Sequence, residues 1–151
     1  MATKTMISTA AANNAVLAVV NLQGGTPPGM LSSGSVLKIY TSNQPAGPDT
    51  APGGGPDLLA SLQLSTQPFS TAPAAGVATA NAIAASTVIL TGTAAWCRIS
   101  SSSQATSSGL GVIDGTVGTA SANCILNSVA LSSGAAISIS SLTVTMPEST
   151  S

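Results

Sequence analysis

The hydrophobic and polar positions of this chain follow one period near its start and another over the rest. In residues 10–22, apolar side chains recur every three or four positions, as they do on one face of a helix. Ser8 or Thr9 can cap the start of such a helix, and Gly24 and Gly25 can end it. The apolar face comprises Ala12, Ala15, Val16, Val19 and Leu22, with Asn13, Asn14 and Asn21 opposite. The pattern predicts one short N-terminal helix.

From residue 35 onward the period changes to two, which is the alternation of a β-strand. Leu37 and Ile39 alternate with Lys38 and Tyr40, and similar segments follow between turn residues. The predicted strands cover residues 36–41, 58–64, 77–83, 87–100, 110–117, 124–131 and 135–146. About seven strands without long helices between them predict an antiparallel β-sandwich, jelly-roll or immunoglobulin-like. We expect residues 1–34 to form an N-terminal arm with the helix and a loop, and residues 35–151 to form the sandwich.

The last predicted strand changes parity along its length. Ile137 and Ile139 occupy odd positions. Leu142, Val144 and Met146 occupy even positions, so a straight strand would place the two sets on opposite faces. One extra residue at positions 140–141 would return both sets to one face. We therefore predict a β-bulge there.

Two segments rich in proline and glycine, residues 26–34 and 42–56, interrupt the alternation. A loop as long as the second usually has a function. We expect both loops and the two chain ends to contact neighbouring subunits. The residues predicted to make these contacts are Pro27, Pro28, Pro45, Pro48, Pro52, Gly54 and Pro56.

Charge is scarce along the whole chain. Charged residues make up 5% of it, where about 25% is typical of soluble domains. A surface with so few charges repels its neighbours weakly and loses its water easily, so it suits close packing against other proteins. Three basic residues are too few to neutralise a run of phosphates, which argues against direct nucleic-acid binding. The apolar run at residues 15–20 is far shorter than the roughly 20 residues that cross a bilayer, so no membrane association is expected.

The groups that usually carry catalysis are scarce too. The chain has no histidine, which removes the commonest general base and the usual nucleophile–histidine pairs. Asp114 before Gly115 is typical of a tight turn. Asp49 and Asp57 border the long loop, but their surroundings lack the ligand spacing of an EF-hand. We predict no enzyme activity, no cofactor, no metal and no small-molecule substrate.

Two interpretations apply to Trp96 and Arg98, which share one face of a predicted strand. They would form either an exposed stacking platform for a sugar or base, or a core tryptophan beside an arginine that reaches solvent or an acid. A lone tryptophan is generally well buried, which favours the second. For Cys97 and Cys124, two buried thiols on neighbouring strands are favoured over a disulfide, since neither lies in a CxxC motif.

A series of short segments is distributed over residues 35–147. They are Val36-Leu-Lys-Ile-Tyr-Thr41, Gln44-Pro-Ala, Asp49-Thr, Leu58-Leu-Ala-Ser-Leu62, Gly76-Val-Ala-Thr-Ala-Asn-Ala-Ile83, Gly92-Thr-Ala-Ala-Trp-Cys-Arg98, Asp114-Gly-Thr-Val-Gly-Thr119, Leu126-Asn-Ser-Val129 and the terminal Ile-Ser-Ser-Leu-Thr-Val-Thr-Met-Pro147. In these segments the chain resembles a family of small tailed-phage proteins, generally described as phage structural or hypothetical proteins. The longer Pro/Gly loop and the two cysteines depart from the family's pattern. The resemblance implies a virion component and transfers no catalytic motif.

Composition and resemblance together predict a non-enzymatic virion structural protein. The favoured role is a capsid decoration or cement protein on the outer capsid surface, bound to the major capsid protein and to copies of itself. The alternatives are a tail, neck or fibre component, or a glycan-binding adhesin.

Overall fold

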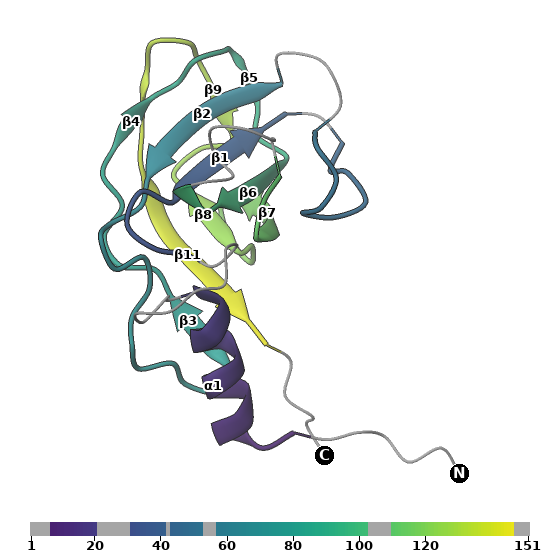
Figure 1. Cartoon of the computed structure of the whole chain (residues 1–151). Helices are drawn as coiled ribbons and strands as arrows, with labels where there is room; N and C mark the ends of the chain where they lie inside the picture. Colours follow the sequence, from purple (N-terminus) through teal and green to yellow (C-terminus); the bar gives the residue numbers. More distant parts are fainter. Residues whose placement is uncertain (1–6, 21–30, 42, 53–56, 103–109, 147–151) are drawn as a thin grey trace.

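The computed structural model describes residues 7–20, 31–41, 43–52, 57–102 and 110–146 (Figure 1). These residues are mainly β with one short helix, as predicted at that level. The elements are α1 (Thr9–Val20), β1 (Val36–Tyr40), β2 (Leu58–Gln63), β3 (Val77–Thr79), β4 (Ser86–Thr87), β5 (Gly92–Thr93), β6 (Trp96–Ser100), β7 (Ile113–Gly118), β8 (Cys124–Leu126), β9 (Ala130–Leu131), β10 (Ala136–Ile137) and β11 (Ile139–Thr145).

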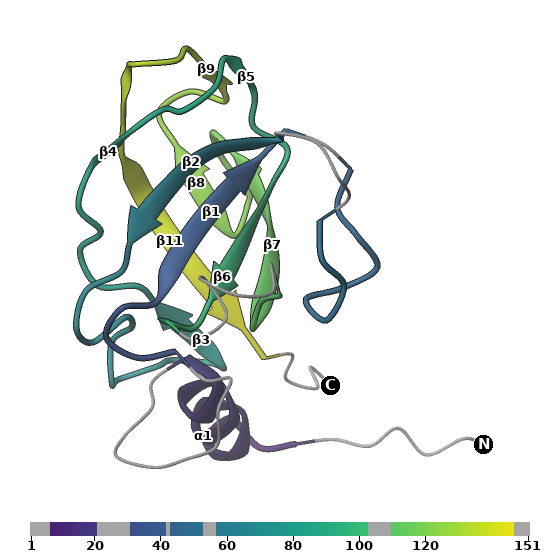
Figure 2. The same ribbon diagram turned by 45° about the horizontal axis from the view of Figure 1, so that its top comes forward.

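Seven of the strands belong to one mixed sheet, in the order β2-β1-β6-β7-β8-β11-β3. Adjacent strands of this sheet run antiparallel, except β7 and β8, which run parallel. The remaining strands form two small pairs, β10 with β4 and β5 with β9. The predicted sandwich or jelly roll is not confirmed, because the large sheet curls on itself and contains a parallel pair (Figure 2).

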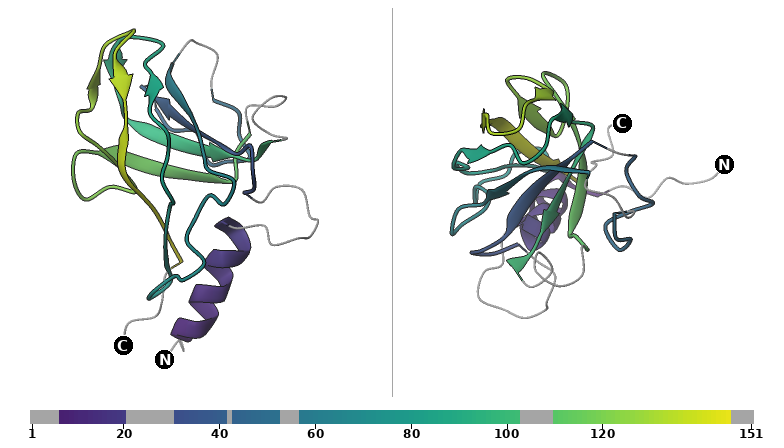
Figure 3. Two further views of the ribbon diagram at one scale, coloured as in Figure 1. Left: turned by 90° about the vertical axis from the view of Figure 1, so that its left-hand side faces the viewer. Right: turned by 90° about the horizontal axis from the view of Figure 1, so that it is seen from above.

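The chain around β4 connects β2 to the far side of this curl. The Ile89 amide donates to the Leu59 carbonyl at 2.7 Å, and the Ser86 hydroxyl donates to the Ser61 carbonyl at 2.9 Å. β4 also pairs with β10, which leads directly into β11. The buried apolar side chains therefore lie inside the curl, which Figure 3 shows from the side and from above.

Three predicted strands prove to be interrupted. Residues 87–100 divide among β4, β5 and β6, residues 124–131 between β8 and β9, and residues 135–146 between β10 and β11. Between these strands the backbone changes partner: the Val88 amide bonds to Ala135, and the Ala94 amide bonds to Val129. The alternation of apolar residues continues through these changes, which is why the sequence pattern did not reveal them.

The predicted bulge in the last strand is confirmed. The register of β11 against β8 shifts between Ile139 and Ser141. Ile137 before the shift and Leu142 after it are both buried in the same core.

The helix begins as predicted, with the Ser8 hydroxyl accepting a hydrogen bond from the Ala11 amide at 3.2 Å. Its buried face is narrower than predicted: Ala12, Val16 and Val20 are buried against the sheet, whereas Ala15 is exposed. The predicted end of the helix at Gly24 and Gly25 lies outside the described residues. Among the ranges that the structure describes, no helix has the length and apolar character needed to cross a membrane.

Candidate functional site

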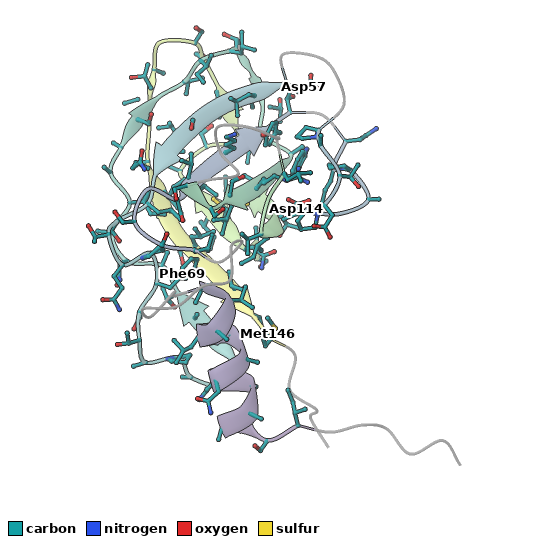
Figure 4. All side chains as sticks on the ribbon, in the orientation of Figure 1. Asp57, Phe69, Asp114 and Met146 are labelled. Atoms are coloured by element: carbon teal, nitrogen blue, oxygen red, sulfur yellow. The ribbon has the colours of Figure 1, made fainter. Side chains whose placement is uncertain are left out.

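The part of the long loop that the structure describes, residues 43–52, is fixed to the face of the sheet opposite the core. Leu37, Ile39, Cys97 and Ile99 point into the core from β1 and β6. Their strand neighbours, which face the other way, pair in register as Tyr40 with Trp96, Lys38 with Arg98, and Arg98 with Asp114. Figure 4 places Asp114 beside this loop.

Arg98 is the residue that holds the loop. Its Nε and Nη2 donate to the two carboxylate oxygens of Asp114 at 2.7 and 2.8 Å. Nη1 donates to the Thr50 carbonyl at 2.8 Å, and Nη2 donates also to the Gly47 carbonyl at 3.0 Å. The side chains of Arg98 and Asp114 are 0% and 4% exposed. The sequence left Arg98 either reaching solvent or paired with an acid, and the structure pairs it with Asp114.

The tight turn predicted at Asp114 and Gly115 is wrong, because both residues lie within β7. Asp114 stands opposite Arg98 in the strand register, so its carboxylate is satisfied by a long-range partner. Gly115 is closely packed, since a Cβ there would lie 3.1 Å from the Cβ of Asn123 and 3.4 Å from the Cys97 sulfur. Local turn statistics cannot register either effect.

Gly111 leaves room for the clamp, which is the set of contacts that Arg98 makes with Asp114 and with the carbonyls of Gly47 and Thr50. Its amide donates to the Pro48 carbonyl at 2.9 Å, which adds a further link to the loop. A Cβ at Gly111 would lie 2.6 Å from Cγ of Arg98, closer than two non-bonded carbon atoms normally approach. Sequence reasoning gave no signal for this role, because Gly111 follows a Ser-rich stretch that resembles an ordinary turn.

The aromatic residues beside the clamp are buried, as favoured for Trp96. Trp96 is 2% exposed and stacks on Tyr40 with ring centroids 4.4 Å apart, while the Arg98 guanidinium carbon lies 5.3 Å from the Trp96 ring centroid. Burial raises the pKa of Tyr40. The pKa of Lys38 is lowered, mainly by burial and to a smaller extent by repulsion from Arg98. Trp96 therefore presents no open ring face for a sugar or base to stack on.

The described loop turns small polar and alanine side chains to solvent. Its exposed residues are Asn43, Gln44, Ala46, Asp49, Thr50 and Ala51. Three of the predicted contact residues, Pro45, Pro48 and Pro52, are half-buried in it. The other four, Pro27, Pro28, Gly54 and Pro56, lie outside the described residues.

The clamp makes the surface even less charged than the composition implies. Arg98 and Asp114 neutralise each other with their side chains almost completely buried. Lys38 and Asp57 are half-buried. Within the described ranges, Asp49 is then the sole charged residue with high exposure.

Cys97 and Cys124 are buried free thiols, as favoured, but they do not lie on neighbouring strands. Cys97 belongs to β6 and Cys124 to β8, with β7 between them in the sheet. The hydrogen bond with Cys124 and burial raise the pKa of Cys97 well above its ordinary value. A buried thiol that keeps its proton is a poor nucleophile and a poor metal ligand.

The chemistry available elsewhere in the described ranges is limited. No group of three or more His, Cys, Asp or Glu side chains is placed there to hold a metal ion. Two surface pockets have volumes of about 110 Å³ each, below the roughly 300–1,000 Å³ of typical small-molecule sites. The clamped loop is thus the strongest candidate site, and its chemistry is that of a contact surface.

Comparison of the chain with protein-family models, curated proteins and solved structures found no match.

Proposed function

We propose that this protein is a non-enzymatic structural component of a phage particle, a decoration protein that bridges subunits of the major capsid protein on the outer surface of the head. The observation that carries the proposal is the surface of the clamped loop, which is held rigidly and exposes a single charged side chain, Asp49, among its described residues. Through this surface the protein would bind the shell and neighbouring copies of itself, by shape complementarity and by burial of apolar side chains.

The energetics of such an interface favour a loop that is already ordered. A free loop would lose conformational entropy on docking, which weakens the complex. Here two backbone carbonyls are held by Arg98 and a third by Gly111 before any partner arrives. Charged residues are depleted at the centres of protein interfaces, because their water must be removed on binding. The neutral loop avoids that penalty.

The resemblance to small tailed-phage proteins supports placing this surface in a virion. A sandwich or jelly-roll classification of the curled sheet stays a prediction, as does the position on the capsid. A tail, neck or fibre component is the second candidate, because a neutral, rigid contact surface would serve any of these assemblies. The adhesin alternative loses support, because Trp96 is buried.

Mass spectrometry of separated heads and tails tests the proposal. We expect the protein in the head fraction, at a constant ratio to the major capsid protein. Its presence in tails alone would contradict the capsid role, and its absence from both would contradict a virion role.

A second experiment tests the contact surface by adding purified variants to heads that lack the protein. Ala46→Glu places a charge on the exposed face of the loop and should reduce retention strongly. Ala135→Glu places the same charge on an exposed turn before β10 and serves as the control. Equal retention of both variants would exclude the loop as the contact.

A further inference from the structure

The sheet is split beside β8. This strand has only three residues and lies between β7 and β11, paired in parallel with Val117 and Gly118 and antiparallel with residues 139–142. Beyond its first residue, Cys124, β7 continues as residues 113–116 and β11 as residues 143–145. Within the described ranges no strand occupies the space between these two continuations.

Asn123 marks the point where the split begins. Its side-chain oxygen accepts a hydrogen bond from the Thr116 amide at 3.1 Å, and its backbone carbonyl accepts one from the Thr143 amide at 2.8 Å. One residue of extended chain thus bridges β7 and β11 at this level. Strands separated by one intervening strand lie about 9–10 Å apart, so the split begins with the width of a single missing strand.

The facing strand edges carry unpaired backbone groups. Backbone amides and carbonyls of a strand point to alternate sides with a period of two. Because Thr116 bonds to Asn123 on the open side of β7, the period of two within the strand turns the amide and carbonyl of Asp114 to the same side. Val112, which precedes the strand, instead donates its amide to Ile99 of β6. Because Thr143 bonds to Asn123 on the open side of β11, Thr145 does likewise. No described residue bonds to the backbone of Asp114 or Thr145 on these sides.

The bottom of the split is apolar and its walls carry no net charge. The pocket of about 110 Å³ found there is lined by Ile99, Leu142 and Val144, among others. Asp114, one of its lining residues, has its carboxylate neutralised by Arg98. A volume of this size accommodates one side chain, and unpaired backbone groups on both sides call for a ligand with a donor and an acceptor at each residue.

We propose that this split, between residues 113–116 of β7 and residues 143–145 of β11, binds an extended, uncharged polypeptide segment of a partner protein. The segment continues the line of β8 and forms hydrogen bonds with the backbones of Asp114 and Thr145. It places one apolar side chain in the pocket over Leu142 and Val144. The inference rests on the proposed function in so far as the partner is taken to be a shell protein, and it states how the shell would be held.

A synthetic peptide tests the inference without any particle. The probe is an acetylated and amidated pentapeptide of alternating threonine and valine, titrated into the full chain while backbone amide signals are followed by NMR. We expect saturable shifts at Asp114 and Thr145. The same peptide N-methylated at every residue cannot donate these hydrogen bonds and should produce no shifts. Absence of saturable shifts with the unmethylated peptide would overturn the inference.

A pair of variants separates the backbone from the side chain. Thr145→Pro removes the amide that faces the split and should weaken peptide binding about tenfold, as expected for one lost hydrogen bond. Thr145→Ala keeps the amide and should bind like the wild type, since this side chain is exposed. Equal binding by both variants would overturn the inference.

Hydrogen exchange of the unmodified chain provides a test that does not depend on any variant folding. The amides of Asp114 and Thr145 should exchange much faster than that of Val144, which pairs with Ala78 in β3. Protection of all three in the isolated, dilute chain would show that the split is already closed. Protection that appears only as the chain is concentrated would identify a second copy as the occupant and overturn the partner assignment.

Peptide binding by a protein absent from virions would contradict the proposed function alone, whereas a protein found in heads that fails the peptide test would contradict this inference alone.

Discussion

Arg98 is shared among one carboxylate and two backbone carbonyls, so its loss or the loss of its acid affects three segments at once. Asp114→Asn keeps the shape of the side chain but leaves the guanidinium buried without its counter-charge. We expect the free energy of unfolding to fall by about 3–5 kcal/mol, as for other broken buried pairs. Urea unfolding followed by Trp96 fluorescence measures it. Asp49→Asn, at an exposed carboxylate, should change it by no more than about 0.5 kcal/mol, and equal effects would refute the clamp.

Cys97 gives the stability a dependence on alkaline pH. Its hydrogen bond with Cys124 and its burial raise the pKa of the thiol above the ordinary 9.0, so the folded chain keeps a proton that the unfolded chain releases. The stabilisation is present below pH 9 and is lost as the pH rises toward the folded pKa. Tyr40, whose pKa is raised by burial, acts in the same direction above 10.0. Lys38 acts in the opposite direction, because burial lowers its pKa.

The Cys97 contribution can be isolated by comparing pH slopes. Thermal unfolding of the wild type and of Cys97→Ala between about pH 8 and 10 should give a Tm that falls more steeply in the wild type. The variant keeps the contributions of Tyr40 and Lys38, so these cancel in the comparison. Parallel slopes would mean that the thiol does not hold its proton in the folded chain.

At the scale of elements, features that follow from the local alternation of apolar and polar residues were predictable from the sequence. Features that depend on contacts between distant segments were not. The bulge near Ser140 was predictable, because Ile137 of β10 and Leu142 and Val144 of β11 can face the same core only if one extra residue lies between them. The clamp was not, because Asp114 and Gly115 form a common turn dipeptide and their partners lie elsewhere in the chain. The parallel pairing of β7 with β8 depends on a short return loop whose path no alternation encodes.

The bulge provides a direct test of register. Deleting Ser140 would return β11 to a straight strand and turn Leu142 and Val144 away from the core. The expected destabilisation exceeds about 4 kcal/mol, beyond the usual range for a single change, and soluble yield should fall with it. Ser140→Ala keeps the chain length at an exposed position and should be close to neutral. A stable, well-folded deletion variant would contradict the proposed register.

The loop and the sheet can be uncoupled through a glycine. Gly111→Ala places a Cβ against the Arg98 side chain, which cannot move without breaking its hydrogen bonds. We expect a loss of about 1–3 kcal/mol, typical of overpacking, and faster proteolytic cleavage within residues 43–52. Gly47→Ala has open space at the corresponding atom and serves as the control. Similar cleavage rates for the two variants would show that the loop is held by other contacts.

At the scale of the whole molecule, low charge predicts how association responds to salt. Interactions between exposed charges weaken as salt shortens the screening length from about 10 Å at 0.1 M to about 3 Å at 1 M. An interface without such charges lacks that dependence. If the protein binds heads as proposed, its retention on them should therefore stay constant, or rise slightly, between about 0.1 and 1 M NaCl. Release at high salt, measured by sedimentation, would show that charges outside the described residues dominate the contact.

The clamp also makes the shape of the loop surface depend on the completed folding of the chain. Thr50 and Arg98 are 48 positions apart in the chain, and Arg98 meets Asp114, 16 positions further on, only after β6 has paired with β7. A nascent or misfolded copy therefore lacks the shape that residues 43–52 adopt in the finished molecule. If a partner binds the loop as proposed, it would bind folded copies in preference to unfolded ones.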